Sequence, residues 1–294
     1  MSASTSPDSA EGRAGRPPRA TPAPVAGPAP RRLCWPALAV AAASIAIPLL
    51  LWWVVAAVVQ WRTQAPFPTP GVTLQRLFGL MQGSLLNDFP LSRHVADSLA
   101  RWSIGFGIAV AVGIALGLLL GWSRLWERLA MPTVTVLQLI PGLAWIPVAI
   151  LLFGIGPRTT IFMIAVTALA PIVINITAGV KGVDEMHLRA ARMMGADDRA
   201  LFLRVLLPGS LPHLLSGLRV GLANGWRVLV AGEMIVGTGT GLGYSIIQAR
   251  WTMDFASAFG CILIICAVGL LVERGIFLPL ERRTVERWGL ARTG

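Results

Sequence analysis

The chain has 294 residues, of which 55% are hydrophobic and 13% are charged, a composition too apolar for an ordinary soluble domain. The formal net charge is +11, but the arginines lie between apolar runs and neither line one amphipathic face nor cluster with aromatic residues, which argues against a nucleic-acid partner. We therefore expect the lipid bilayer to be the solvent of this protein.

The N-terminal part of the chain divides into a tail and a first membrane segment. Residues 1–31 are rich in Pro, Ala, Ser, Gly and Arg, which predicts a disordered tail. Residues 32–294 are expected to form one transmembrane domain, beginning with an uncharged run from Leu33 to Gln60. This run is longer than the apolar region of a cleaved signal peptide and long enough to cross a bilayer, so it predicts a retained first transmembrane helix.

A shorter helix is predicted after a proline-rich connection. Its apolar residues recur near helical spacing, but the segment is too short and too polar to span, as is typical of an amphipathic helix. The prolines are Pro66, Pro68 and Pro70, and the apolar residues are Leu74, Leu77, Phe78, Met81 and Leu85.

Five further apolar segments each have room for one crossing. In chain order they are Trp102–Ser123, Leu129–Pro157, Thr159–Val180, Ser216–Val236 and Phe255–Val272. The sequence therefore predicts an all-α integral membrane protein with six transmembrane helices.

The segment from Asp184 to His213 is polar and charged although it lies between two apolar segments, so it must stand in water. Met186 to Met194 predicts one short helix, and Gly195 gives the backbone freedom for a turn. Asp197 or Asp198 is suited to cap a second helix, which Pro208 is expected to end because proline lacks a backbone donor.

The basic residues indicate which side of the membrane holds this loop. Of the 25 Lys and Arg residues, seventeen fall on the side of both termini and the 184–213 loop and six on the other side, with Arg219 and Arg227 left out as intramembrane or boundary residues. The positive-inside rule then predicts that both termini and the loop are cytoplasmic.

The polar loop resembles the cytoplasmic EAA loop of permease subunits of bacterial ABC importers. The resemblance rests on the spacing of Ala190, Ala191, Gly195, Val205, Leu207 and Pro208, and on the later runs 217–219 (GLR) and 241–244 (GLGY). It implies a type I importer permease fold in which the two short helices insert into a cleft of an ATPase subunit. The ATPase-coupling residues would be Arg189, Ala190, Ala191, Gly195, Ala196, Leu207 and Pro208. Arg189 stands where the motif has glutamate, which puts an acidic contact to the ATPase in doubt, and a surface hairpin without a partner is the alternative.

The sequence carries little enzymatic chemistry. Lys181, the sole lysine, is not part of a phosphate-binding loop, so ATP is expected on a separate ATPase chain and no cofactor in this one. The glycine-rich run 237–243 lacks G-x-G-x-x-G spacing and is expected to be a flexible outer turn. The three histidines are scattered, and the three cysteines lack metal-ligand spacing, so we expect no catalytic, metal or disulfide site. These residues are His94, His187, His213, Cys34, Cys261 and Cys266.

Small residues recur every four positions on two predicted crossings, at Gly113, Gly117 and Gly121 and at Gly217, Gly221 and Gly225. Such stripes let helix backbones approach closely in lipid. The second stripe is expected to pack beside a translocation path, or alternatively only within one subunit.

Polar residues within the apolar segments are the candidates for that path, because ionisable groups in a membrane usually face a partner or a watery cavity. They are Asn175, Asn224, Arg227 and Glu233. Arg227 either pairs with an acid elsewhere or meets an anionic solute. Asn175 either lines the path or bonds to a neighbouring helix.

Within the permease family, residues 225–235 (GWRVLVAGEMI) and the ending 281–288 resemble members that import nitrate, taurine and aliphatic sulfonates. The similarity extends from about Ser92 onward, and related members carry bicarbonate, cyanate or thiamine-precursor pyrimidines. The resemblance implies a homodimer in the bacterial inner membrane with two cytoplasmic ATPase subunits and an external solute-binding protein. An integral-membrane enzyme using Arg227 and Glu233, or an ion channel, are the alternatives from other classes.

Overall fold

The computed structural model describes residues 35–64, 66–277 and 279 of the chain. The predicted tail, residues 1–31, and the C-terminal run 281–288 lie outside the described residues. By its internal contacts the chain divides into two units, residues 1–49 and 50–294. The packing described below lies within the second unit.

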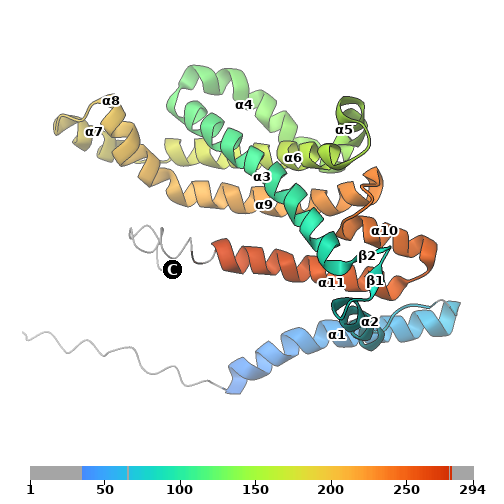
Figure 1. Cartoon of the computed structure of the whole chain (residues 1–294). Helices are drawn as coiled ribbons and strands as arrows, with labels where there is room; N and C mark the ends of the chain where they lie inside the picture. Colours follow the sequence, from blue (N-terminus) through green and yellow to red (C-terminus); the bar gives the residue numbers. More distant parts are fainter. Residues whose placement is uncertain (1–34, 65, 278, 280–294) are drawn as a thin grey trace, which may run out of the picture. The chain divides into compact units, whose positions relative to one another are not determined.

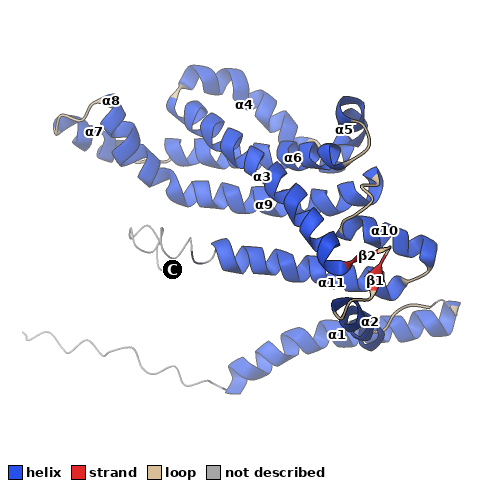
Figure 2. Cartoon of the chain, viewed as in Figure 1, coloured by secondary structure: helices blue, strands red, loops and turns tan. Residues whose placement is uncertain are grey.

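The described residues form eleven α-helices and one short β-hairpin (Figures 1 and 2). The helices are α1 (Trp35–Thr63), α2 (Pro70–Met81), α3 (Leu91–Trp122), α4 (Arg124–Leu139), α5 (Ile146–Phe153), α6 (Pro157–Lys181), α7 (Glu185–Met193), α8 (Asp198–Leu201), α9 (Leu207–Val236), α10 (Leu242–Thr252) and α11 (Phe255–Val272), and the hairpin strands are β1 (Leu85–Leu86) and β2 (Phe89–Pro90). A 3-10 turn (Gly142–Trp145) joins α4 to α5, and π-helical turns follow α8 (Phe202–Leu206) and α11 (Glu273–Phe277).

Among the described residues, five helices are long and apolar enough to cross a membrane, and one bent pair makes a sixth candidate. The five are Ala42–Thr63, Leu91–Trp122, Pro157–Lys181, Asp198–Val236 and Phe255–Gly275. With the bent pair counted as one span, the predicted number of six transmembrane segments is confirmed. The predicted amphipathic helix is also present as α2, capped by Thr69, although Leu85 lies beyond it in β1.

The third predicted crossing, Leu129–Pro157, is wrong as a single helix. Its two parts, 124–139 and 142–153, meet at an angle of 102°. Ile140, which precedes Pro141, has extended backbone (φ −75°, ψ 118°), because the ring of a following proline disfavours the helical conformation. The break therefore has a local cause in the sequence.

Two predicted helix ends also differ. Helix α3 begins at Leu91 and not at Trp102. Its first turns are amphipathic and contain charged residues, so a prediction based on uncharged runs leaves them out. Pro208 does not end a helix but lies in the first turn of α9, after the wider π-helical turn at 202–206. In the π-helical turn the amide of Leu207 donates to the carbonyl of Phe202, and a wider turn of this kind accommodates the proline within a continuing helix.

Helix α6 is packed between α3 and α9, and both glycine stripes face it. A Cβ atom added at Gly117 of α3 would lie 2.7 Å from Cβ of Ile176, and one added at Gly221 of α9 would lie 2.8 Å from Cγ1 of Ile172. Gly113 approaches the same Ile172 side chain from α3. The stripe of α9 thus packs against α6 within one chain, the alternative that the sequence left open.

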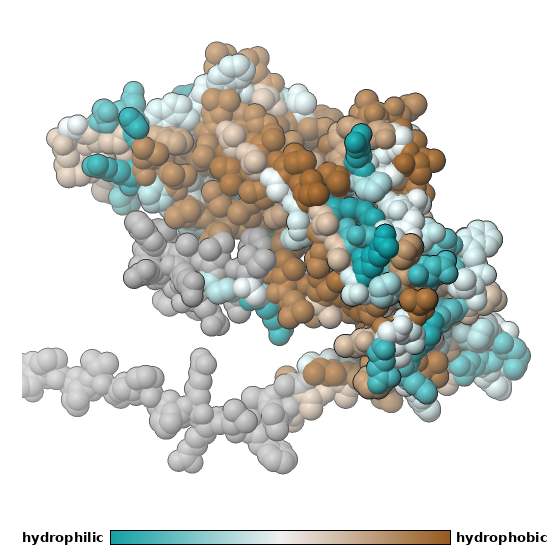
Figure 3. Space-filling model, viewed as in Figure 1, coloured by the Kyte–Doolittle hydropathy of each residue, from teal (hydrophilic) through white to brown (hydrophobic). Residues whose placement is uncertain are grey.

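Helices α6 and α3 differ in how much of their surface is exposed. Most of α6 is buried, including Ile164, Ile172 and Ile176, each 0% exposed. Hydrophobic side chains cover the middle and C-terminal part of α3, whereas hydrophilic side chains lie both around its N-terminal end, near α10 and the β-hairpin, and on the loop of α7 and α8 (Figure 3). This distribution fits helices that stand in lipid with a polar loop in water.

Replacing Gly117 by Ala should separate α3 from α6, because the added methyl group would have to displace Ile176; overpacking of this kind costs about 1–3 kcal/mol. We expect a lower midpoint of thermal unfolding in detergent. Gly107→Ala is the matched control on the same helix, since nothing lies within 4 Å of a Cβ added there. Equal midpoints for the two variants would contradict the close packing.

Candidate coupling site and a buried polar cluster

The polar loop folds as a helix, a glycine turn and a second helix, as predicted. Asp184 caps α7 by accepting a hydrogen bond from the amide of Met186. At the end of α7, the amide of Ala196 donates to the carbonyl of Ala191 (3.1 Å) and the amide of Gly195 donates to that of Arg192 (3.0 Å). This pair of hydrogen bonds forms a Schellman motif, in which the first residue after the helix C-cap adopts the left-handed conformation.

Gly195 is that residue, with φ of +84°. A side chain at this φ is strained, which explains the need for glycine. After the turn, Asp197 caps α8 by accepting from the amide of Ala200 at 2.8 Å. Of the two predicted capping residues, Asp197 has this role and Asp198 lies in the first turn of α8.

Exposed methionines lie on the α7 side of the turn, before Gly195. Met186, Met193 and Met194 have 71%, 84% and 82% of their surface exposed. Methionine side chains are flexible and polarizable and are common on surfaces that adapt to a partner. Sequence reasoning missed them, although three methionines in a polar nine-residue segment are a visible signal.

A pocket of about 330 Å³ lies under the turn. It brings together three of the predicted coupling residues, Ala191, Gly195 and Ala196, and its other lining residues are Met194, Asp197, Ala200, Arg204 and Val205. The remaining predicted residues do not line it. Arg189 and Ala190 lie on α7, and Leu207 and Pro208 lie in the first turn of α9.

The net charge of the unpaired side chains in the loop is positive. Arg189 pairs with Glu185 one turn earlier at 2.5 Å, on an exposed face of α7. Asp184 and Asp197 are used as caps. The side chains of Arg192, Arg199 and Arg204, by contrast, have no hydrogen bond or ion pair within the part of the chain that the structure describes.

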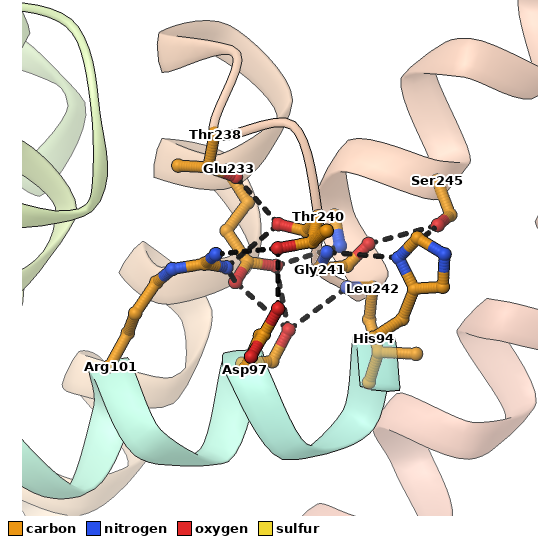
Figure 4. Close-up of polar contacts among 11 residues, drawn as sticks. His94, Asp97, Arg101, Glu233, Thr238, Thr240, Gly241, Leu242 and Ser245 are labelled. Carbon is orange, nitrogen blue, oxygen red and sulfur yellow. Dashed lines mark hydrogen bonds and ion pairs between the residues drawn. The ribbon is translucent and has the colours of Figure 1, made fainter. Parts of the chain in front are cut away.

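At the opposite end of α9, Glu233 lies in a buried polar cluster (Figure 4). Its side chain is 0% exposed, and Arg101 of α3 pairs with it at 2.6 Å. The hydroxyl of Ser98 donates to the same carboxylate (2.9 Å), and so does the amide of Gly243 (3.0 Å). The carboxylate of Glu233, one of the candidate path residues, is thus enclosed and paired within this chain.

Side chains of α3 also fix the glycine-rich turn between α9 and α10. The amide of Gly241 donates to Nδ1 of His94 (3.0 Å), which leaves the histidine proton on Nε2 to reach the carbonyl of Leu86 (2.8 Å). Thr240 donates to Asp97 (2.6 Å) and accepts from Arg101 through its carbonyl (2.8 Å). A turn is present as predicted, and side chains of α3 hydrogen-bond its backbone groups.

The α3 members of this cluster were missed in the sequence. His94, Asp97, Ser98 and Arg101 recur at helical spacing and therefore share one face of α3. Arg101, which directly precedes the uncharged run from Trp102, is one of the six basic residues that the sequence analysis counted on the other side of the membrane. The helical spacing of these polar residues is the signal that could have found them.

The other predicted path residues lie apart from the cluster. The side-chain amide of Asn175 donates to the carbonyl of Pro171 in its own helix at 2.8 Å. The Cβ atom of Asn175 contacts Gly217 of α9, so Asn175 lies where α6 meets α9. Arg227 is exposed on α9, and no acid pairs with it among the described residues. Asn224, one turn earlier, is half-buried.

Comparison with known proteins identifies the class of protein to which this chain belongs. The family described as "Binding-protein-dependent transport system inner membrane component" matches residues 109–281. The chain is 32% identical over 240 residues to the taurine transport system permease protein of Escherichia coli, covering 82% of this chain and 86% of that protein. It is 31% identical over 239 residues to the nitrate import permease protein of Synechocystis sp., covering 80% and 85%.

A solved structure of the MetNI methionine ABC transporter in inward-facing conformations has the same fold. It matches with a TM-score of 0.57 at 21% identity, over 66% of this chain and 95% of that chain. The helices and the water-facing loop thus define a multi-pass permease with the fold of type I ABC importers. The chain belongs to the family of inner-membrane components of binding-protein-dependent transport systems, and it is a transport component and not an enzyme.

Replacing Glu233 by Gln should destabilise the protein, because the buried guanidinium of Arg101 would lose its carboxylate; breaking a buried pair costs about 3–5 kcal/mol. The measurement is the midpoint of thermal unfolding in detergent. Glu185→Gln is the control, since it removes an exposed pair that contributes little. If both variants unfold at the same temperature, the cluster does not hold α3 to α9.

Proposed function

We propose that this chain is the membrane-spanning subunit of an ATP-driven importer and that the turn at Gly195 docks on an ATPase subunit. The observation that carries the proposal is the water-facing pair of short helices with a glycine turn, exposed methionines and a pocket beneath it. A surface of this kind on a membrane protein fits a soluble partner. The family description, which names dependence on a binding protein, supports the same role.

The remaining partners follow from this role. The chain has no phosphate-binding loop in its sequence, so two separate ATPase subunits would bind and hydrolyse ATP, and this chain would need no cofactor. A second copy of the chain would complete the path, and an external solute-binding protein would deliver the solute. The unpaired side chains of Arg192 and Arg204 favour an acidic docking cleft on the ATPase.

The loop and both termini are proposed to be cytoplasmic, in a bacterial inner membrane. With Arg101 assigned to the interior of α3, the balance of basic residues stands at seventeen against five, so the positive-inside rule favours this orientation more strongly. An impermeant thiol reagent should label a cysteine at Met253 in intact cells, and one at Met193 only after permeabilisation. Both positions are exposed, and labelling of Met193→Cys from outside would refute the orientation.

The solute is proposed to be a small anion such as a sulfonate, taurine or nitrate. Arg227 lies on a face of α9 that α6 does not cover, together with the exposed Ser216 and Val220. An unpaired guanidinium within a membrane span is costly unless water, an acid or an anion meets it. The relatives are named for taurine and nitrate, which supports an oxyanion, and bicarbonate, cyanate or a pyrimidine precursor are the alternatives.

Replacing Gly195 by Pro should uncouple transport, because proline cannot adopt a φ of +84° and loses the amide bonded to Arg192; the cost is roughly 3 kcal/mol. We expect normal membrane insertion with loss of ATPase co-purification, or of solute uptake in vesicles. Gly83→Pro is the matched control at the other end of the molecule, where the glycine also has positive φ (+108°) and a bonded amide. Normal co-purification together with normal uptake in Gly195→Pro would refute docking through this turn.

Replacing Arg227 by Gln should reduce uptake of an anionic solute while leaving assembly with the ATPase intact, and Arg227→Lys should restore part of it because lysine keeps the charge. The measurement is uptake per assembled complex in vesicles. Arg219→Gln on the same helix is the control, since that guanidinium pairs with Glu273 at 2.6 Å. Uptake that falls only in proportion to assembled complex would make Arg227 a structural residue.

A further inference from the structure

A groove at the junction of α3 and α8 has features that the coupling role does not use. Its volume is about 450 Å³, and its surface is mostly hydrophobic. It is lined by Ala115, Leu118, Leu119 and Trp122 of α3, by Asp198 and Arg199 of α8, and by Phe202. The rings of Trp122 and Phe202 meet edge to face with centroids 5.6 Å apart and form one wall.

The apolar part of the groove continues along α3. Exposed hydrophobic side chains recur on one face of this helix from its middle to the groove, at Ile104, Ile108, Val112, Leu119 and Trp122. Because α3 is a membrane span, this stripe lies in the hydrocarbon region. Trp122, the last residue of α3, marks the level of the interface, where tryptophan is enriched.

The polar end of the groove carries two opposite charges that are not used elsewhere. Both Asp198 and Arg199 are exposed. Neither side chain has a hydrogen bond or ion pair within the described ranges, and they do not pair with each other. Asp197, and not Asp198, caps α8, so the carboxylate of Asp198 has no structural task in the loop.

We propose that this groove binds a phospholipid whose headgroup joins a phosphodiester to a primary ammonium, that is, a phosphatidylethanolamine. The phosphate lies at the guanidinium of Arg199, whose planar array of donors suits phosphate oxygens. The ammonium lies at the carboxylate of Asp198, and an acyl chain lies along the stripe of α3. The lipid headgroup thus complements the charges of Asp198 and Arg199, and the acyl chain of the lipid complements the apolar wall of the groove.

The two charges select among headgroups. An anionic lipid without an ammonium satisfies Arg199 but brings its net charge toward Asp198. A phosphatidylcholine carries both charges, but its quaternary ammonium has no N–H to donate to the carboxylate. The lipid would contact the second helix of the coupling loop, yet this site rests on the membrane span and stands whether or not the loop docks on an ATPase.

Photo-crosslinking tests the site in the full chain. Leu119 is replaced by p-benzoylphenylalanine, and the protein is placed in vesicles with equal mole fractions of phosphatidylethanolamine, phosphatidylcholine and phosphatidylglycerol. After irradiation, the adducts are identified by mass. We expect the phosphatidylethanolamine adduct to exceed each of the others by about fivefold, as for one exposed ion pair near the upper end of the usual range.

Two variants and one control separate the contributions. Asp198→Asn should shift the preference from phosphatidylethanolamine toward phosphatidylglycerol, and Arg199→Gln should lower the adducts of all three lipids. Arg128→Gln is the control, because Arg128 is exposed near the start of α4, close to the same boundary, but does not line the groove. Adducts in proportion to vesicle composition, or adducts with another protein chain, would overturn the proposal, while transport plays no part in the readout.

Discussion

The close approach of α3 and α9 to α6 is the constraint on which the rest of this structure depends. Lipid offers no hydrophobic reward for bringing apolar helices together, so association has to come from dispersion contacts at short range. Glycines on both outer helices allow such contacts with the isoleucines of α6, and Ile172 is touched from both sides. Because α3 and α9 both pack closely on α6, the N-terminal part of α3 lies near the C-terminal end of α9, and Arg101 can reach Glu233.

The buried ion pair is stable because further hydrogen bonds pair the remaining polar atoms of both side chains. A buried carboxylate and guanidinium lose more hydration than their mutual attraction returns unless further hydrogen bonds complete them. Ser98 and the amide of Gly243 complete the carboxylate, and the turn at Thr240 completes the guanidinium. The same bonds hold a glycine-rich turn that would otherwise have many conformations, so one costly interaction fixes the start of α10 as well.

Sequence reasoning found what depends on local properties and missed what depends on packing. Uncharged runs located the crossings, and the conformational demand at Gly195 located the turn, because both signals lie within a few residues. The burial of Glu233 was not readable in this way, since its partner Arg101 is distant in sequence and lies outside the uncharged run. The break at Pro141 is a different case: the local signal was present, but length and hydropathy alone passed over it.

The helical path from Asp198 to Val236 runs for 39 residues without a non-helical break. At 1.5 Å per residue such a rod is roughly 58 Å long, longer than a bilayer is thick. One end carries the water-facing turn, and the other carries the enclosed carboxylate of Glu233. The π-helical turn at 202–206 lies between them and the helical backbone continues through it, so the water-facing loop and the Glu233 cluster stand on one uninterrupted helical segment.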